Sequence, residues 1–593
     1  MSLKILGVAD SINSGAAIIK GGRIDTAINE ERLNRNKMCM GFPRLSIEEV
    51  MRVADVSPND VDAVAVATNM LFWRPECLPY TDYFRENRGG WMREALLSMG
   101  GTFSALMGNS SFARNTYHTL KLLLTQNRRR KIRKVLADDF GINAPVRFVD
   151  HHLSHAASAY FTSGFERATV ITLDGAGDAK CSRVYRVQQG EFEELQNLDS
   201  YHSIGNYYSY VTHLCGFKGH KHEGKITGLA AHGEPAYLDM FRRYVDWDGE
   251  SIRNIGKCFD HSAIDKLRRD LPEDFSREDL SASVQTLLEK AVSAYADYWV
   301  RESGISNVAL AGGVFANVKL NQYVHELDSV ENVFVHPGMG DDGLAAGAAL
   351  FEHNRQEGYT PNSVMGDVYL GPRQLENDIQ EAIRGYDVHV VERSEPLESK
   401  VAQMLADGKV IARSAGRMEY GPRALGNRTI MYKTTDPTVN RWLNERLDRT
   451  EFMPFAPVTL WEDRHDCYKN ISGAEETARF MTITFDCTEE MKDRSPAVVH
   501  IDGTARPQLI KEEENPSYYQ ILNEYKQITG IPSLINTSFN MHEEPIVNTP
   551  QEAVKAFLST ELDALVLGDH LLVSDHESAV AEGRGASSRS RGR

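Results

Sequence analysis

The feature that most restricts the fold of this chain is one sequence pattern that occurs twice. Residues 4–19 (KILGVADSINSGAAII) and residues 168–187 (ATVITLDGAGDAKCSRVYRV) each place a polar, glycine-containing turn between two apolar runs. Apolar runs around a short turn predict β-hairpins, in which the turn exposes backbone N–H groups and a carboxylate. Two such hairpins predict a duplicated α/β core that holds a phosphorylated ligand between its halves.

Three later segments add elements to this core. Residues 280–300 repeat apolar side chains at three- and four-residue spacing, which predicts a helix. Residues 307–321 (NVALAGGVFANVKLN) predict a strand, a turn at Gly312 and Gly313, and a helix. Glycines in that turn would let a nucleotide approach the backbone, although an ordinary tight βα turn has the same pattern. Residues 333–351 predict another strand, a GDDG loop and a closely packed Ala/Gly-rich helix.

A chain of 593 residues is too long for one hydrophobic core, so two or more domains are expected. The sequence becomes loop-rich near residues 358–400, and a new pattern begins around Glu398. We therefore predict one domain over residues 1–375 and a second over residues 395–575. The Gly/Ser/Arg-rich residues 576–593 are predicted to form a disordered tail.

Composition narrows the classes of function. A hydrophobic content of 41% and a charged content of 25% are those of an ordinary globular protein, and no apolar run approaches the roughly 20 residues of a membrane helix. The net charge of −17 argues against binding to nucleic acid or anionic lipid. The seven cysteines are scattered without a C-x-x-C, which favours reduced thiols in a cytoplasmic protein over a disulfide scaffold. Whether the chain forms a homo-oligomer is left open.

Histidines and aspartates form a candidate metal site. In DHHLSHAASAY, His151 and His155 are four residues apart and would share one helix face, whereas His152 would point elsewhere. Asp174 follows an apolar strand in a glycine turn, and the pair Asp341–Asp342 occupies a similar strand end. A lone H-x-x-x-H is more often structural than metal-binding. Two imidazoles with two carboxylates, however, suit iron, manganese or zinc, and few protein ligands leave positions open for a substrate oxygen.

Other polar clusters allow two interpretations each. Glu223 and Lys225 lie beside glycines in HKHEGKITGLAAHGEP, where a lysine suggests phosphate contact and an exposed loop is an equally good reading. The basic run at residues 127–134 (NRRRKIRK) is interpreted as a solvated helix face, with a role in binding an acidic substrate as the minority reading.

The C-terminal part is rich in groups that bind anions. Arg417, Arg423 and Arg428 crowd the stretch GRMEYGPRALGNRTIM, and planar guanidinium groups bind phosphate or carboxylate bidentately. Arg506 and a polar segment follow downstream, so we predict an anion pocket with polar walls. Buried Arg–Glu pairs could account for one or two of these arginines. The polar segment contributes Asn536, Ser538 and Asn540.

Taken together, these motifs resemble the NodU/CmcH family of O-carbamoyltransferases. The resemblance runs from about residue 4 to about residue 574 in the family's order and rests on NEERLNRNK, DHHLSHAASAY, LDGAGD, EGKITGLA, AGGVFANVKLN, GDDGLAAGAAL, GRMEYGPRALGNRTI, FMPFAPV, HIDGTARPQ and NTSFNMHEEPIV. It implies an α/β fold: an N-terminal actin/Hsp70-like (ASKHA) domain of duplicated ribonuclease H-like units, followed by a YrdC-like domain.

The resemblance also implies a reaction. The C-terminal domain would combine carbamoyl phosphate with ATP and Mg²⁺ to form carbamoyl adenylate. The N-terminal domain, with Fe²⁺ or another divalent metal such as Mn or Zn, would transfer the carbamoyl group to a hydroxyl of a small-molecule natural product. Nucleic acid and membrane are not expected partners.

Residue by residue, the match implies three sets of site residues. The metal ligands would be His151, His155, Asp174 and Asp341. The nucleotide or carbamoyl adenylate in the N-terminal domain would contact Gly312, Gly313, Asn317, Glu223 and Lys225. Lys37 and Arg32 would face the N-terminal active site, and Lys37 would be catalytic together with Asp10 and His152. Carbamoyl phosphate and ATP in the C-terminal domain would contact Arg417, Arg423, Arg428, Arg506, Asn536, Ser538 and Asn540.

One position departs from the family pattern. The family often has D-G-H-N-A-S in the first hairpin, where this chain has DSINSG, with Ile12 in place of the histidine. If that histidine removes the acceptor's proton, another group must do so here, and the candidates are Asp10, His152 or a metal-bound water.

Acceptor specificity is expected in residues 70–130 and 236–280. Two alternatives are a threonylcarbamoyl-type tRNA modification enzyme and a non-catalytic nucleotide-binding member.

Overall fold

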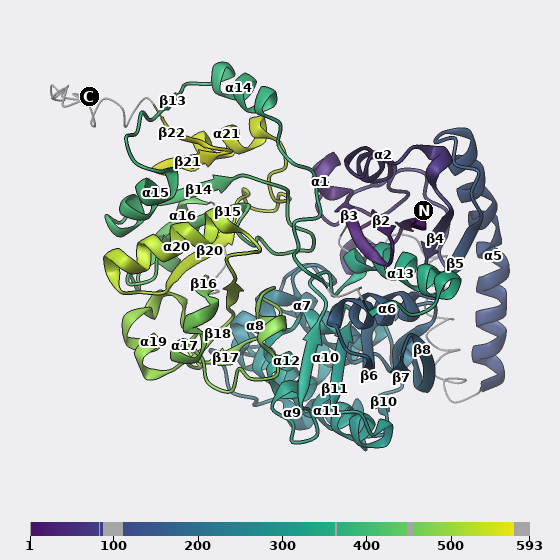
Figure 1. Cartoon of the computed structure of the whole chain (residues 1–593). Coiled ribbons are helices and arrows are strands. Elements are labelled where there is room, and N and C mark those ends of the chain that lie inside the picture. The colour runs from purple at the N-terminus through teal and green to yellow at the C-terminus, as the bar shows by residue number, and fades with distance from the viewer. Residues whose placement is uncertain (1, 82, 87–110, 362–364, 448–454, 575–593) are drawn as a thin grey trace, which may run out of the picture.

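The computed structural model (Figure 1) describes residues 2–81, 83–86, 111–361, 365–447 and 455–574. The tail predicted at residues 576–593 lies outside this range, as do residues 87–110 of one segment expected to select the acceptor. Within the described residues, no helix combines the length and apolar character needed to cross a membrane.

The first sheet contains the first predicted hairpin. Strands β1 and β2 pair antiparallel from Lys4 opposite Lys20 to Ala9 opposite Gly15, so residues 10–14 form the turn. Strands β4 and β5 continue the sheet in parallel from β1, giving the order β3-β2-β1-β4-β5. The strands are β1 Lys4–Ala9, β2 Gly15–Lys20, β3 Arg23–Asn29, β4 Ala63–Ala67 and β5 Val146–Val149.

The second sheet repeats this arrangement strand for strand. Its order is β12-β11-β6-β7-β8, with an antiparallel meander followed by two parallel strands. Because the two sheets share one strand order and one set of directions, the predicted duplicated ribonuclease H-like arrangement is confirmed. The strands are β6 Arg167–Gly177, β7 Lys180–Gln188, β8 Glu191–Asp199, β11 Asn307–Ala311 and β12 Asn332–Val335.

Two helices fill the space between these sheets. Helix α6 (His151–Ser163) packs on β6 and β11, and α13 (Leu344–Glu357) packs on β1, β2 and β4 and against α6. The helices approach closely because Gly347 has no side chain: a Cβ there would lie 1.9 Å from the carbonyl oxygen of Ser154. The predicted close packing of the Ala/Gly-rich helix is therefore confirmed, and both helices begin at the same end of the core.

Further helices cover the other face of the second sheet. The helix predicted at residues 280–300 is confirmed within α11, which also packs on α7 and α8. The covering helices are α7 Ile204–Leu214, α8 Glu223–Ala230, α9 Leu238–Phe241, α10 His261–Asp270, α11 Arg277–Ser303 and α12 Val318–His325. On the first sheet, α2 (Arg44–Val53) packs on β2 and β3, and α1 is Glu31–Asn34.

The C-terminal part forms a third sheet, which Figure 1 shows on the left of the molecule. Its order is β13-β22-β21-β14-β15-β20-β16-β19, and α15 and α20 pack together on its central strands. The strands are β13 Val388–Val390, β14 Ile411–Ser414, β15 Arg428–Lys433, β16 Ala456–Leu460, β19 Gln508–Ile510, β20 Ser533–Ser538, β21 Ala564–Leu567 and β22 His570–Ser574. The main helices are α14 Glu376–Gly385, α15 Leu397–Ala406, α16 Val439–Arg446, α20 Pro516–Thr529 and α21 Pro550–Ser559. The predicted α/β class holds for this part as well.

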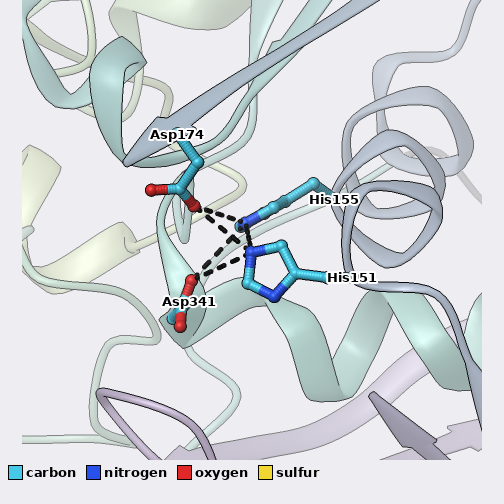
Figure 2. A group of neighbouring side chains, drawn as sticks. All are labelled: His151, His155, Asp174 and Asp341. Carbon is cyan, nitrogen blue, oxygen red and sulfur yellow. Dashed lines mark hydrogen bonds and ion pairs between the residues drawn. The ribbon is translucent and has the colours of Figure 1, made fainter. Parts of the chain in front are cut away.

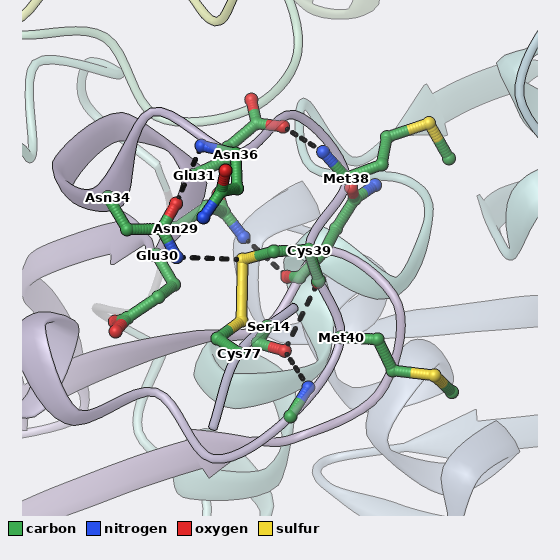
Figure 3. Close-up of a disulfide and its surroundings, with 12 residues drawn as sticks. Ser14, Asn29, Glu30, Glu31, Asn34, Asn36, Met38, Cys39, Met40 and Cys77 are labelled. Atoms are coloured by element: carbon green, nitrogen blue, oxygen red, sulfur yellow. Dashed lines mark hydrogen bonds between the residues drawn. A yellow bond between two sulfur atoms is a disulfide. The ribbon is translucent and has the colours of Figure 1, made fainter. Parts of the chain in front are cut away.

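The expectation of wholly reduced thiols is wrong for one pair of cysteines. Cys39 and Cys77 form a disulfide across 38 residues of sequence (Figure 3). Met40 pairs with Leu78 in an isolated antiparallel β-bridge, which places the neighbouring cysteines side by side. Scattered spacing in the sequence could not reveal this contact because it depends on the return of the chain after β4. The other five cysteines are free and buried.

Candidate active site

The two predicted histidine ligands lie in the first turns of α6. The Asp150 side chain accepts a hydrogen bond from the backbone N–H of Leu153, at 3.0 Å, and so caps the helix that begins at His151. Residues four apart share a helix face, and both imidazoles project from the same side of α6 (Figure 2). Both side chains are almost completely buried.

The two carboxylates come from the ends of two other elements. The pairing register of β6 with β7 shifts between Leu173 and Gly177, which releases Asp174 from the regular ladder. Asp341 opens the short 3-10 turn that leads into α13. Figure 2 shows the four side chains converging from α6, β6 and this turn, so both halves of the duplicated core contribute.

The spacing of these four groups fits a single metal ion. The Nε2 atoms of His151 and His155 lie 3.1 Å apart, and each is 3.2–3.3 Å from Oδ2 of Asp174 and 3.5 Å from Oδ1 of Asp341. One ligand atom from each residue lies within 4.8 Å of the others. With metal–ligand bonds of about 2.1 Å, neighbouring ligands are about 3.0 Å apart in an octahedron and about 3.4 Å apart in a tetrahedron. The chemistry of the set, two imidazoles and two carboxylates, suits iron, manganese or zinc.

The electrostatics of the cluster also favour a cation. Burial opposes protonation of His151, but the carboxylates of Asp341 and Asp174 outweigh it and raise its pKa to about 9. The same balance of burial against the two carboxylates raises the pKa of His155. Burial would raise the pKa of Asp174, yet the two imidazoles hold it well below its usual value. The two carboxylates therefore create a site that attracts positive charge into the protein interior.

One hydroxyl fixes the orientation of a ligand ring. Thr68 Oγ1 lies 3.1 Å from Nδ1 of His151, the ring nitrogen that faces away from the cluster. A hydrogen bond on this nitrogen leaves Nε2 as the metal-binding atom. Thr68 has a positive φ of 71°, which is rare for a β-branched residue. Nδ1 of His155 is buried without a hydrogen-bond partner in the described part of the chain.

The structure argues against Asp10 as the base that removes the acceptor's proton. Nε of Arg128 donates to Oδ2 of Asp10 at 2.9 Å, Nη2 donates to Oδ1, and both side chains are fully buried. Both carboxylate oxygens are therefore engaged by one guanidinium group. Arg128 also corrects the interpretation of residues 127–134 as a wholly solvated face, since it turns inward from α5 (Ser111–Asp138) while Arg130, Lys131, Arg133 and Lys134 are exposed.

His152, the other candidate base, is enclosed. Its Nδ1 bonds to Thr172 Oγ1 at 2.9 Å, and its Nε2 is buried without a partner in the described residues. Burial, with the neighbouring His151 and His155, lowers its pKa well below the usual value. A neutral ring packed inside the core is not placed to receive a proton from a bound alcohol.

The glycines predicted to contact a nucleotide lie next to the metal-ligand strand. Gly312 has a φ of 105°, and a Cβ there would lie 2.2 Å from the carbonyl oxygen of Leu173. A Cβ on Gly313 would lie 3.1 Å from Oδ1 of Asp174. Asn317 caps α12 by accepting from the N–H of Leu320 and also donates to Gln285 Oε1 at 2.7 Å. Gly313, which is exposed, therefore borders the cluster beside Asp174, whereas Gly312 is buried against Leu173.

Glu223 and Lys225 lie in a helix, not in a loop. They open α8, where Glu223 Oε1 accepts from the Ser209 hydroxyl at 2.7 Å. The Lys225 ammonium lies 5.4 Å from the ring centroid of Phe217. The sequence misled here because the glycines of this stretch occur within the helix.

The NEERLNRNK motif lies at the contact between the two parts of the chain. Nη2 of Arg32 donates to the carbonyl oxygen of Gly421 at 2.9 Å. Nη1 and Nη2 of Arg35 donate to the carbonyls of Ile546 and Pro545 at 2.8 and 2.7 Å. Arg32 thus contacts the arginine-rich C-terminal loop at Gly421, where that loop packs against Pro337 and Gly338. The expectation that Arg32 faces the N-terminal site stays a prediction. Lys37 is half-buried and lies two residues before the disulfide-bonded Cys39.

Two of the predicted phosphate-binding arginines hold the backbone. Arg417 donates to the carbonyls of Gly371, Leu370 and Asp25 at 2.8–3.0 Å. Arg428 is fully buried and donates to the carbonyls of Ala415 and Asn427 at 2.8 Å. Burial lowers the pKa of Arg428 to about 10. Both arginines therefore have a part in shaping the motif loop, whatever ligand it binds.

Three of the remaining C-terminal site residues lie on or just after β20, a central strand of the third sheet. Asn536 and Ser538 alternate along β20, which pairs with β15, so their side chains share one face. Nδ2 of Asn536 donates to Gln508 Oε1 at 2.6 Å, and Nδ2 of Asn540 donates to the carbonyl of Glu544 at 2.7 Å. Arg423 and Arg506 are half-buried.

The same loop contains a buried carboxylate, Glu419, that was not predicted from the sequence. Oε1 of Glu419 accepts hydrogen bonds from the backbone N–H groups of Leu425, Asn427 and Arg428 at 2.8–2.9 Å. A single acid among several arginines in GRMEYGPRALGNRTI was the signal that could have identified it. Glu419 fixes the curve of the loop that presents Arg423.

Comparison with known proteins adds independent information. The family described as Carbamoyltransferase N-terminus matches residues 4–350, and the family described as Carbamoyltransferase C-terminus matches residues 402–574. Nodulation protein NolNO of Sinorhizobium fredii is 33% identical over 95% of this chain and 79% of its own length. An uncharacterized protein of Methanocaldococcus jannaschii is 30% identical over 96% of this chain and 99% of its own. Among solved structures, T. kodakarensis HypF is 16% identical to this chain, with a TM-score of 0.31. The match covers 60% of this chain and 48% of the HypF chain.

Proposed function

Because the chain belongs to the carbamoyltransferase family, we propose that it is an O-carbamoyltransferase that consumes carbamoyl phosphate and ATP. It forms carbamoyl adenylate in the C-terminal part and transfers the carbamoyl group to a hydroxyl of a small-molecule natural product in the N-terminal part. The observation that carries this proposal is the convergence of two imidazoles and two carboxylates between the halves of the duplicated core.

The cluster would hold the metal that we propose as Fe²⁺, with Mn or Zn as alternatives. When bound, the ion supplies a Lewis acid that polarises the carbamoyl oxygen. His151 and His155 direct Nε2 to this point, and Asp174 and Asp341 balance the positive charge. The Thr68 hydroxyl holds the His151 ring so that Nε2 faces the cluster.

The residues beside the cluster would hold the nucleotide end of the carbamoyl adenylate. Gly313 is exposed next to Asp174, and Gly312 lets the turn pack closely on the backbone of Leu173. Asn317 follows them at the N-terminus of α12, where the helix favours negative charge. In this arrangement the leaving phosphate would lie close to the carbamoyl carbon that the hydroxyl attacks.

The C-terminal loop would bind carbamoyl phosphate and MgATP. Arg423 and Arg506 supply positive charge, while Asn536, Ser538 and Asn540 supply polar contacts from the centre of the sheet and the segment after it. Arg417 and Arg428 keep the loop in shape through their bonds to backbone carbonyls. A site lined by these groups would shield a labile anion from water and orient it for attack on ATP.

Two measurements test this function. Carbamoyl-phosphate-dependent exchange of labelled pyrophosphate into ATP reports adenylate formation, and a mass gain of one carbamoyl group on an alcohol reports transfer. We expect both activities, each abolished when carbamoyl phosphate is omitted. Absence of exchange with Fe²⁺, Mn²⁺ and Zn²⁺ in turn would contradict the proposal.

A further inference from the structure

His220 lies beside the metal-ligand loop but outside the metal cluster. Its Cε1 atom, which is bonded to Nε2, is 4.0 Å from the position that a Cβ on Gly175 would occupy. Gly175 directly follows the ligand Asp174, and Asn206 Oδ1 lies 3.2 Å from the same position. The ring is half-buried and is therefore partly open to solvent beside this loop.

The imidazole of His220 is held in one orientation by its neighbours. The ring stacks on Phe84 with centroids 5.3 Å apart and meets Tyr83 edge-on at 5.9 Å. Its Nδ1 lies 3.3 Å from Ser209 Oγ, and the Ser209 hydroxyl donates to Glu223 Oε1 at 2.7 Å. The backbone N–H of His220 also donates to Glu223 Oε1, with the nitrogen and oxygen 2.5 Å apart, and this bond fixes the backbone at His220.

These contacts determine which ring nitrogen can accept a proton. The hydroxyl proton of Ser209 is committed to Glu223, so the Ser209 oxygen accepts a hydrogen from Nδ1 of His220. Nε2 then carries the lone pair, and it has no hydrogen-bond partner in the described part of the chain. The serine and the carboxylate behind it stabilise the ring when Nε2 becomes protonated.

The backbone at His220 has a positive φ of 64°, in the left-handed region. Histidine, like asparagine and aspartate, adopts this region more often than other side chains do. The contacts of Phe84, Ser209 and Glu223 hold His220 in this conformation.

We propose that His220 is the general base that activates the acceptor hydroxyl, an inference that rests on the proposed carbamoyl transfer. The acceptor's O–H proton passes to Nε2 of His220 as its oxygen bonds to the carbamoyl carbon. The bond from that carbon to the phosphate oxygen breaks, and its electron pair leaves with AMP. The other candidates are engaged elsewhere: Asp10 by Arg128, and His152 inside the core.

The variant His220→Gly tests this role. Glycine accepts the positive φ without strain, so the substitution removes the imidazole and leaves the backbone conformation intact. With excess methanol as the probe acceptor and carbamoyl phosphate and ATP as donors, methyl carbamate is measured by mass spectrometry. We expect its formation to fall at least about 100-fold, with pyrophosphate exchange and metal content per chain unchanged. Added imidazole, which fits the space beside Phe84, should restore part of the lost rate.

His213→Asn is the matched control. His213 also packs against Phe84, with centroids 5.4 Å apart, and it lies outside the segments expected to select the acceptor. It should keep methyl carbamate formation within about threefold of the parent protein. Transfer by His220→Gly within that limit would overturn the assignment, as would a loss that imidazole does not rescue or that His213→Asn shares. Absence of pyrophosphate exchange in the parent protein would instead overturn the proposed function, and this inference with it.

Discussion

The hydroxyl of Tyr420 lies 3.2 Å from Nε2 of His336, which joins the C-terminal motif loop to the strand end that leads to Asp341. Thr162, which contacts the other ring nitrogen of His336, determines which partner donates in this bond. The Thr162 hydroxyl donates to the carbonyl of Ser158, so Thr162 Oγ1 accepts from Nδ1–H of His336 at 2.9 Å. Burial lowers the pKa of His336 to about 3, so the ring is neutral, and its Nε2 accepts a hydrogen bond from Tyr420.

Tyr420→Phe should therefore destabilise the protein and loosen the metal site. The substitution leaves Nε2 of His336 buried without a donor, which costs about 1–3 kcal/mol. The same Tyr420 O–H is shared with the carbonyl oxygen of Asp342, 3.3 Å away and next to the ligand Asp341, so the substitution removes that donation as well. Urea denaturation should show the loss in the free energy of unfolding, and chelator competition should show weaker metal binding.

Tyr323→Phe provides the control for this prediction. Tyr323 is 41% exposed, and removal of an exposed hydroxyl changes the free energy of unfolding by less than about 0.5 kcal/mol. If both variants unfold at the same urea concentration as the parent protein, the bond from Tyr420 to His336 has no role in stability.

Substitutions in the two parts of the chain should affect different steps. His155→Ala removes one imidazole of the cluster, so transfer should fall at least about 100-fold while adenylate formation continues. Arg423→Ala removes positive charge from the C-terminal loop, so adenylate formation should fail while carbamoyl adenylate supplied to the protein is still used. Pyrophosphate exchange and carbamate product, measured in parallel, separate the two steps. Loss of the same step in both variants would show that the sites are not divided in this way.

The features that the sequence predicted correctly depend on local patterns. The spacing of His151 and His155 places both on one face of a helix wherever the helix packs. The two hairpins follow from apolar runs and glycine turns, and duplication follows from finding them twice. Asp174 could be linked to the histidines because it ends an apolar run just downstream of them.

The features that the sequence did not predict are contacts between distant residues. Arg128 and Asp10 are 118 positions apart, and nothing near either one indicates the other. Cys39 meets Cys77 only because the chain after β4 returns to the loop before α2. His220 gains its place beside Gly175 from the packing of α7 and α8 on the second sheet. For these residues, the local sequence indicates the chemistry of each side chain but not the distant residue that it contacts.

Reduction of the disulfide between Cys39 and Cys77 should lower the free energy of unfolding. The five free cysteines should not change on reduction. A cross-link that spans 38 residues restricts the unfolded chain, and the expected contribution is about 4 kcal/mol. Urea unfolding with and without dithiothreitol should show this difference, and the double variant Cys39→Ser, Cys77→Ser should not respond to the reductant. Thiol titration in denaturant should give five groups before reduction and seven after it. Seven groups before reduction would rule out the bond.

Glu543 should give the protein an acid-sensitive contact between its two parts. Lys221 Nζ and His222 Nε2 each lie 2.8 Å from a carboxylate oxygen of Glu543. Partial burial of Glu543 opposes ionisation, but the hydrogen bond from Lys221 and the nearby positive charges lower its pKa to about 2, against an ordinary value of 4.5. A carboxyl group with a lowered pKa stabilises the folded state above about pH 4.5, and this stabilisation is lost as the pH falls toward 2.

The variant Glu543→Gln isolates that contribution. The difference in urea midpoint between the parent protein and the variant should be largest above pH 4.5 and should shrink as the pH falls toward 2. Because the carboxylate is partly exposed, added salt should reduce the difference as well. If the difference in urea midpoint does not change with pH, Glu543 stabilises the protein through packing and neutral hydrogen bonds and not through its charge.

Thr68→Val tests whether the hydroxyl behind His151 tunes the metal site. Valine keeps the β-branched shape in a position that is almost completely buried, so the change is confined to the bond between Oγ1 and Nδ1. Without that bond the His151 ring loses the group that fixes its tautomer, and metal affinity should fall about 10- to 100-fold. Thr68→Ser keeps the hydroxyl and should bind metal as the parent protein does. Chelator competition, with the metal content of each variant measured at equilibrium, distinguishes them; equal affinity for Val and Ser would show that the ring is oriented by the packing of α6 alone.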